Sequence, residues 1–289
     1  MPSLRDIKRR IQSVKNTQQI TKAMKLVAAS KLRKAQQAIL VARPYAIKVM
    51  DVLNHLAARC NLDLHPLLEQ REGSKILYLI ITSDKGLCGG FNSGVIRRAL
   101  KEMADHAESD VSLVVAGKKG RDIFKNKPQK TIQNFLEWTK DFDYLKAAGI
   151  GDLVADEFVQ KKVDKVYVIY NEFKSVMQQD VVVEQLLPVV PENMEVDKND
   201  GHVVDYVYEP DEESILDDLL KRYMSVQIFR AFLESSASEH GARMTAMDNA
   251  TRNAGDMIGN LSLTYNKARQ AYITKELIEI VNGAEALKG

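Results

Sequence analysis

The hydrophobic pattern is helical at the start of the chain. Ser3 and Asp6, three residues apart, form a capping-box sequence at which a helix begins. Pro44 is the interior helix breaker of this segment, and we expect a kink near it. The pattern predicts one long helix over residues 3–58. Its first apolar residues, spaced 3, 4 and 3 apart on one face, are Leu4, Ile7, Ile11 and Val14.

A second and longer helical pattern covers residues 210–289. It opens with Pro210 followed by three acids, which suits a first helical turn. We interpret the glycines inside it, Gly241, Gly255 and Gly259, as sites of close approach to another helix. Residues then recur in steps of three and four, which predicts a left-handed coiled coil with a partner helix. These positions are Leu233, Ala237, His240, Arg243 or Met244, Met247, Thr251, Ala254, Ile258, Leu261, Tyr265, Ala268 and Tyr272.

The end of this second helix has a different pattern, because residues 273–287 are apolar around most of the helix circumference. Such a helix is buried on nearly all sides. The first helix is about 20 residues shorter and cannot supply that cover. We therefore expect the two helices to pair antiparallel, with residues 7–14 against residues 258–265, and the free end to enter a surrounding partner.

The middle of the chain changes to alternating strands and helices. Continuous apolar runs at residues 76–81, 111–116 and 166–170 are typical of buried parallel strands, and residues 181–187 predict an edge strand. Helices are expected at about 93–107, 118–126 and 143–161. The predicted fold class is α/β: a small Rossmann-like domain over 75–190 inserted between the coiled-coil helices of 1–58 and 210–289, with connectors at 59–74 and 191–209.

The charge distribution adds a second asymmetry. Residues 1–48 hold twelve Lys and Arg but the single acid Asp6, although the net charge of the whole chain is only +2. A strongly basic helix requires an acidic partner, and composition alone leaves nucleic acid and protein open. The first 44 positions contain no aromatic residue that could stack on a base. No apolar run reaches the ~18 residues of a membrane span.

Candidate chemistry is sparse. Cys60 and Cys88 form no CxxC, and the five His are scattered, so we predict no metal site and no disulfide. The glycine-rich turn at residues 82–92 (TSDKGLCGGFN) stands where a phosphate-binding loop could stand, but it matches neither GxxxxGK[ST] nor GxGxxG. A structural turn is the simpler interpretation. We predict no cofactor and no catalytic group, with a nucleotide-binding enzyme as the alternative.

Three blocks of sequence resemble one family. Residues 4–11 (LRDIKRRI) with 16–31 (NTQQITKAMKLVAASK), residues 238–254 (SEHGARMTAMDNATRNA) and residues 265–276 (YNKARQAYITKE) are similar to the gamma subunits of bacterial F-type ATP synthases. The resemblance implies a non-catalytic rotary shaft, the central stalk. Such a shaft couples rotation of the membrane c ring, driven by protons, to ATP synthesis or hydrolysis at the beta subunits.

The resemblance also implies partners and site residues. The partners would be the alpha and beta subunits, the epsilon subunit and the c-subunit ring, with no nucleic acid. The chain would lie peripherally at the cytoplasmic face of the bacterial inner membrane, held there only through the complex. The positions that match the family's contacts with beta subunits are Met24, Lys25, Arg269, Gln270, Thr274 and Glu276.

Overall fold

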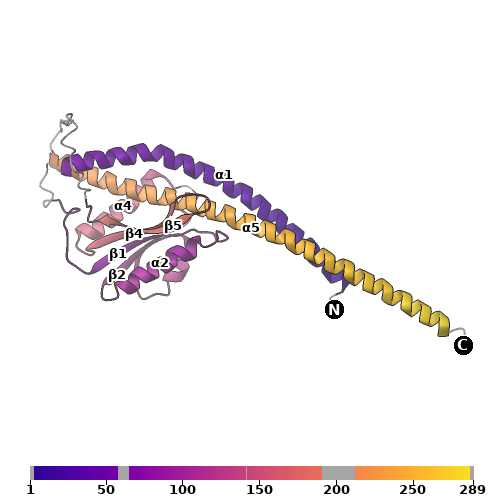
Figure 1. Cartoon of the computed structure of the whole chain (residues 1–289). Coiled ribbons are helices and arrows are strands. Elements are labelled where there is room, and N and C mark those ends of the chain that lie inside the picture. The colour runs from indigo at the N-terminus through magenta and orange to yellow at the C-terminus, as the bar shows by residue number, and fades with distance from the viewer. Residues whose placement is uncertain (1–2, 58–64, 141, 191–211, 287–289) are drawn as a thin grey trace. The chain divides into compact units, whose positions relative to one another are not determined.

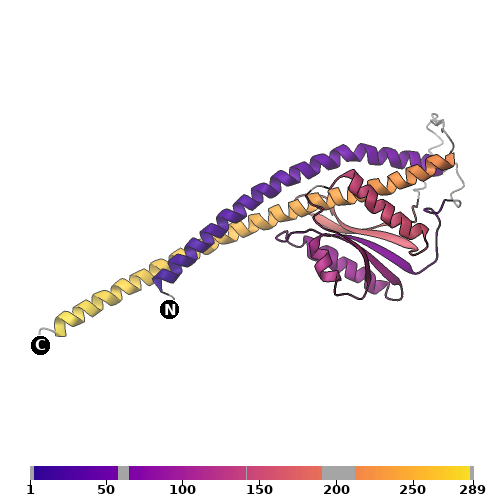
Figure 2. The ribbon, with the colours of Figure 1, turned by 180° about the vertical axis from the view of Figure 1, so that it is seen from behind.

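The structure is a computed structural model that describes residues 3–57, 65–140, 142–190 and 212–286. Two helices dominate it: α1, Leu4–Ala57, and α5, Glu212–Ala286. The chain forms two compact units, one of Met1–Ala28 with Arg243–Gly289 and one of Ala29–Ala242. Within each unit α1 and α5 run side by side in opposite directions, as Figures 1 and 2 show. Both expected long helices and their antiparallel pairing are confirmed.

The larger unit contains a five-stranded sheet in the order β3-β2-β1-β4-β5. Strands β1 to β4 run parallel to one another, and β5 is antiparallel to β4. Strands β1, β2 and β4 are apolar because both faces of the sheet are covered. The strand bounds are β1 Lys75–Ile81, β2 Asp110–Ala116, β3 Lys130–Phe135, β4 Lys165–Phe173 and β5 Gln179–Leu187.

Helices cover the sheet on both faces, which gives the unit three layers. One core contains α2, Phe91–Asp105, and Phe124 of α3, Lys118–Phe124. The opposite core contains α4, Tyr144–Val159, together with Leu53 of α1 and Phe232 of α5. The long helices therefore belong to the hydrophobic core of this unit as well as to the coiled coil.

Three details differ from expectation or extend it. Strand β3 was not predicted, because its sequence KTIQNF is half polar and half-buried at the sheet edge. Pro44 lies inside α1, which continues past it as predicted, and the kink expected near it remains a prediction. The connector at 191–209, Pro210 and Cys60 lie outside the described residues, so the predicted domain boundaries there remain predictions.

The glycine-rich turn closes the carboxyl end of the sheet with its own side chains. Asp84 accepts hydrogen bonds from the backbone N–H groups of Lys118 and Glu137 at 3.1 and 3.0 Å. Asn92 Oδ1 accepts from the backbone N–H of Ser83 at 2.9 Å. The crevice in which an α/β fold binds a nucleotide lies at this edge. Here side chains of the turn bind the neighbouring loops, which favours the structural interpretation.

Candidate interaction surface

The smaller unit is a two-helix coiled coil whose seam follows the predicted spacing. On α1 the buried positions include Ile7, Thr21 and Ala28. On α5 they include Met247 and Ala254. The intervening seam positions are half-buried, and most of the side chains between them are exposed. This heptad spacing of burial is the packing of a left-handed coiled coil.

Polar side chains fix the register of the two helices. Thr21 Oγ1 lies 2.8 Å from Thr251 Oγ1, and Gln18 Nε2 donates to the Thr251 carbonyl at 3.3 Å. Lys25 Nζ donates to Asp248 Oδ1 at 2.5 Å. We call these five residues the polar layer. Continuing the antiparallel register toward the amino terminus places residues 7–14 beside residues 258–265, the pairing predicted from the sequence.

The glycines of α5 have different surroundings. A Cβ added to Gly255 would lie 3.2 Å from Gln18 Nε2, so close helix approach is confirmed there. A Cβ at Gly241 would meet Phe173 Cε2 at 3.3 Å, which is a contact with the sheet hairpin and not with α1. Gly259 has nothing within 4 Å of such a Cβ. The close-approach interpretation is therefore wrong for Gly241 and Gly259.

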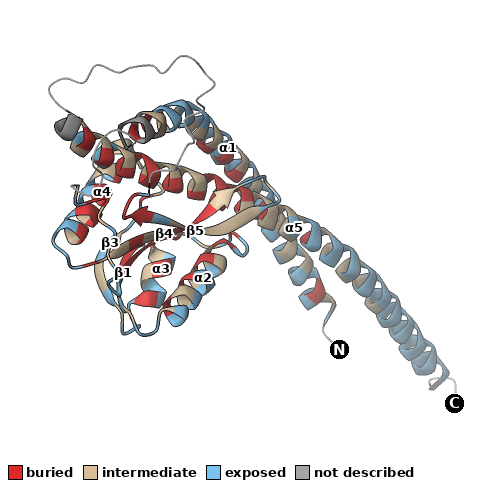
Figure 3. Cartoon of the chain, turned by 60° about the vertical axis from the view of Figure 1, so that its left-hand side comes forward, coloured by how far each residue is buried: buried red, intermediate tan, exposed pale blue. Residues whose placement is uncertain are grey.

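The pairing ends where α1 begins. In the same register Leu4, the first residue of α1, lies opposite Ala268 of α5. Beyond this point every described side chain of residues 269–285 is exposed, which Figure 3 shows as a continuous pale blue helix. We call residues 269–285 the exposed end. At ~1.5 Å per residue it is ~25 Å long.

The exposed end presents apolar and polar groups together. Its aliphatic side chains are about half accessible or more, with Leu277 at 57% and Ile280 at 67%. Large aliphatic side chains gathered in this way mark an interaction surface. The large aliphatic side chains of the exposed end are Ile273, Leu277, Ile278, Ile280 and Val281, and all of them are exposed.

The four expected contact residues of α5 all lie on this exposed end. Arg269 and Glu276 are seven residues apart and share one side of the helix, whereas Gln270 and Thr274 share another. The Thr274 hydroxyl donates to the backbone carbonyl of Gln270 at 2.9 Å. This bond lies within the helix and does not involve the side-chain amide of Gln270. A hydrogen bond with Glu276 raises the pKa of Tyr272. These four residues therefore lie together on the exposed end, and no hydrogen bond or ion pair joins them to another described helix or strand.

The two expected residues of α1 lie on the seam instead. Met24 is half-buried, and Lys25 forms its ion pair with Asp248. This pairing lowers the pKa of the Asp248 carboxyl, chiefly through the hydrogen bond from Lys25. Sequence reasoning missed Asp248 as a partner. The available signal was its position, because Asp248 directly follows Met247, a residue of the predicted heptad.

The basic character of the first helix is displayed outward. Among the seven cations of residues 4–28, Lys25 is the one with an ion pair in the part of the chain that the structure describes. The other six, including Lys22, are exposed. At the helix start, Asp6 accepts hydrogen bonds from the Ser3 hydroxyl at 2.7 Å and from its backbone N–H, which confirms the capping box. These bonds lower the pKa of Asp6.

Groups that could hold a metal or carry out chemistry are sparse in the described residues. The described segments contain no cluster of three or more His, Cys, Asp or Glu placed to hold a metal ion. Cys88 is buried, and its Sγ accepts a hydrogen bond from Asn92 Nδ2 at 3.2 Å. None of the helices described is both long and apolar enough to cross a membrane. The exposed end, with its large aliphatic side chains, is suited to binding macromolecules.

Comparison with known proteins gives consistent results along the whole chain. A family model described as ATP synthase matches residues 3–287. Proteins named ATP synthase gamma chain are similar over 100% of both chains: one from Geotalea uraniireducens is 47% identical over 291 residues, and one from Anaeromyxobacter sp. is 49% identical over 293.

Solved structures show the same fold. A chain from the central stalk and c ring of Tetrahymena thermophila mitochondrial ATP synthase is 26% identical, with a TM-score of 0.62 over 80% of this chain and 99% of that chain. A chain from the Euglena gracilis mitochondrial ATP synthase, in a structure of the F1 region and c ring, has a TM-score of 0.69 at 20% identity, covering 98% of this chain and 94% of that chain.

Proposed function

The chain belongs to the family of ATP synthase gamma chains, and we propose that it works as the rotating shaft of a bacterial enzyme of this kind. A gamma chain is a non-catalytic subunit of its complex. The proposed role is to carry the rotation of a proton-driven ring of membrane-embedded c subunits to the catalytic beta subunits. There the rotation drives ATP synthesis, or ATP hydrolysis drives the rotation in reverse.

The observation that carries this proposal is the exposed end. A helix of ~25 Å that has aliphatic side chains on several sides, and that no described residue of its own chain covers, needs a sleeve around it. A ring of alternating alpha and beta subunits would supply such a sleeve. We propose that residues 277–286 fill it as a bearing, because apolar burial is non-directional and scales with area.

Torque requires directional contacts, and the polar residues next to the bearing can make them. Hydrogen bonds are each worth ~0.5–1.5 kcal/mol net and depend on angle. We propose that Arg269, Gln270, Thr274 and Glu276 bond to loops of the beta subunits at particular rotary angles. A shaft shifts a beta subunit between conformations only if it contacts those conformations unequally. Four polar groups on two sides of one helix provide this inequality.

The outward cations of α1 add a longer-range attraction to acidic segments of the beta subunits. Lys22 and Lys25 do not contribute equally, because Lys25 is already paired with Asp248 at 2.5 Å and Lys22 is exposed. Reversing the charge at Lys22 should therefore weaken coupling through the partner contact. The effect should grow at low salt, where exposed charges are least screened. We propose that Met24 contacts the same segments from the edge of the seam.

The other partners follow from the same assignment. The α/β domain would bind the epsilon subunit and the c ring, and the chain would lie at the cytoplasmic face of the inner membrane, attached to it through the complex alone. No cofactor or nucleic acid is needed for this role.

The test is reconstitution from purified subunits. The chain alone should show no ATPase activity, and activity should appear when alpha and beta subunits are added and co-purify with it. Hydrolysis that stays with the pure chain through further purification would falsify the proposal. Specific, salt-resistant binding of DNA by the chain would favour the nucleic-acid alternative instead.

A further inference from the structure

One edge of the sheet has no strand beside it. In the order β3-β2-β1-β4-β5, β3 is terminal, and within the described residues it pairs with β2 alone. An edge strand presents a row of backbone N–H and C=O groups with which another extended chain can pair. At ~3.3 Å per residue, β3 offers a backbone edge ~20 Å long. This edge can therefore accept a further strand.

The segment that leads into β3 is strongly basic. Residues 118–130 contain six Lys and Arg and the single acid Asp122, which gives a net charge of +5. Two of these cations are paired, Lys118 with Glu137 at 2.8 Å and Arg121 with Asp122 at 2.8 Å. The other four are exposed and have no ion pair in the part of the chain that the structure describes. They are Lys119, Lys125, Lys127 and Lys130.

The acids close to this segment are already bound by cations. The hydrogen bond from Arg121 lowers the pKa of the Asp122 carboxyl, and the charges of nearby lysines lower it further. Glu137, which lies just beyond β3, accepts hydrogen bonds from Lys118 and Lys140 at 2.8 and 2.6 Å, and these bonds lower its pKa to about 2. Both carboxylates are thus ionised and occupied at neutral pH, and the four exposed lysines keep their charge for a partner.

The opposite edge of the sheet shows why the partner is not a second copy of this chain. Strand β5 carries acids, but Glu184 is paired with Arg230 at 2.7 Å and Asp180 accepts a hydrogen bond from Gln178 Nε2 at 3.2 Å. A second copy would bring to β3 either these occupied acids or another basic β3. Lysines on an edge strand oppose the pairing of like chains. The same charge attracts an acidic strand.

The backbone edge also distinguishes an acidic protein segment from other polyanions. Nucleic acid or anionic lipid would neutralise the lysines but leave the N–H and C=O groups of β3 without strand partners. An extended acidic peptide satisfies both, because main-chain hydrogen bonds supply affinity and side chains supply specificity. Leu136, which directly follows β3, is 39% exposed and adds an apolar contact at the end of the edge.

We propose that β3 is a docking edge for an extended acidic segment of another protein, which adds to the sheet as a further strand with its acids near Lys127 and Lys130. The edge and the exposed end of α5 belong to different compact units, so this proposal goes beyond the shaft role and does not rest on it.

The experiment titrates the full chain with the peptide Glu-Asp-Val-Thr-Val-Asp-Glu, blocked at both ends, and measures binding by calorimetry and backbone hydrogen exchange. The matched peptide replaces the adjacent Val-Thr by Pro-Pro. It keeps every charge and removes one backbone donor from each edge of the added strand, whichever edge faces β3. One lost hydrogen bond corresponds to roughly a 3–10-fold weaker affinity.

We expect saturable binding of the first peptide with a Kd below ~1 mM, and binding weaker by at least that factor for the proline peptide. Amide exchange in residues 130–135 should slow with the first peptide, because strand pairing protects backbone N–H groups. Binding through charge alone would leave this exchange unchanged.

Variants locate the site. Lys127→Glu with Lys130→Glu reverses two exposed charges and should weaken binding of the first peptide about 3–10-fold at low salt, and less at high salt. Lys31→Glu with Lys34→Glu is the matched control, with the same charge change and spacing at exposed positions of α1, and should leave the affinity unchanged. If the first variant does not fold, the two peptides are still compared on the unaltered chain.

Four results would overturn the proposal. These are no saturable binding, equal affinity for the two peptides, unchanged exchange in residues 130–135, and loss of binding in the α1 control. Vesicles of phosphatidylglycerol form the last arm of the test. Binding to the vesicles that is lost on reversing Lys127 and Lys130, with no binding of the peptide, would assign the lysines to a membrane surface instead.

Discussion

Truncation after Glu276 separates the bearing from the polar contacts beside it. The change removes residues 277–289 and leaves Arg269, Gln270, Thr274 and Glu276 in place. In the chain alone, the described side chains removed are all exposed and end a helix without a partner. We therefore expect the free energy of unfolding of the isolated chain to change by less than ~0.5 kcal/mol.

In the assembled complex the loss should be much larger. The truncation removes four aliphatic side chains that remain 57%, 54%, 67% and 58% exposed in the free chain: Leu277, Ile278, Ile280 and Val281. Complete burial of such a side chain contributes about 1.5–3 kcal/mol, so burying the remaining half or so gives ~1–1.5 kcal/mol each. The sum of ~4–6 kcal/mol is an upper estimate, because ordering on association offsets part of it. A factor of ten in affinity needs ~1.4 kcal/mol, so assembly at least tenfold weaker is expected.

The assay measures assembly and turnover separately. Size-exclusion chromatography of mixtures with alpha and beta subunits, over a range of concentrations, gives the assembled fraction. Bulk ATPase and single-molecule rotation are then measured on fully assembled complexes only. Truncated complexes should assemble poorly but rotate once assembled. The control is Gln270→Ala in the full-length chain, which should assemble normally and turn over more slowly.

Two outcomes would refute this reasoning. If the truncated shaft, fully assembled, stops rotating while the Gln270→Ala shaft runs at the normal rate, the bearing and the torque contacts are assigned the wrong way round. If the truncation lowers the stability of the isolated chain as much as it weakens assembly, residues 277–286 pack within the chain and need no sleeve.

Further expectations concern the coil and the sheet. Thr21→Val should lower the free energy of unfolding in urea by ~0.5–1.5 kcal/mol. The double variant with Thr251→Val should lose less than the sum of the two single variants, because both sides of the contact are then apolar. Strictly additive losses would contradict the pairing. Asp248 has a lowered pKa, so its stabilising effect is present above pH ~4 and lost as the pH falls through the lowered pKa; Asp248→Asn should remove this acid dependence from thermal melts. Gly117→Ala should destabilise the chain by more than ~1 kcal/mol, since φ is +94° and the new Cβ would lie 2.2 Å from the Thr82 carbonyl oxygen. Gly259→Ala should instead stabilise it by up to ~1 kcal/mol in the same assay, because Gly259 lies in a helix with open space around the new Cβ.

The fold was largely predictable where one physical signal was strong. Strands β1, β2 and β4 are buried on both faces, so their sequences are continuous apolar runs. The heptad of α1 and α5 is visible because the coil has one narrow seam. Strand β3 carried no such signal, since it is an edge strand with half-buried side chains and its alternation is interrupted by a register shift between Leu113 and Val114 of its neighbour.

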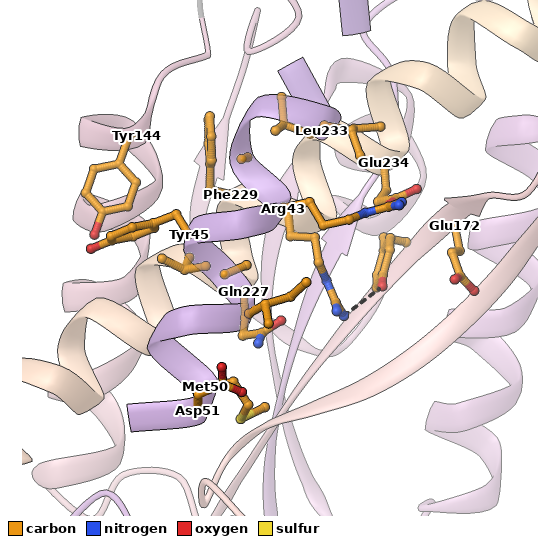
Figure 4. A pocket seen from close by; sticks show the side chains of 17 residues that line it. Arg43, Tyr45, Met50, Asp51, Tyr144, Glu172, Gln227, Phe229, Leu233 and Glu234 are labelled. Carbon is orange, nitrogen blue, oxygen red and sulfur yellow. Dashed lines mark hydrogen bonds between the residues drawn. The ribbon is translucent and has the colours of Figure 1, made fainter. Parts of the chain in front are cut away.

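The candidate surface was predictable in kind but not in detail. A helix end that is apolar on all sides can be identified from the sequence, and so can a helix rich in Lys and Arg. The roles of Arg269 and Gln270 came from resemblance alone, because an exposed polar residue on a helix has no distinguishing pattern. A cavity lined by residues of α1, α4, β4 and α5 (Figure 4) was not predictable from the sequence, since its walls come from four elements far apart in the chain.

The polar layer joins residues that are made at very different times. Lys25 and Asp248 are separated by 223 positions. At a synthesis rate of ~5–20 residues per second, α1 emerges ~10–45 s before the partner that covers its seam exists. During this interval its apolar stripe is open to the stripes of neighbouring nascent chains. The cations on its outer face repel those chains, so the charge that suits the finished shaft also keeps the unfinished one from pairing with a copy of itself.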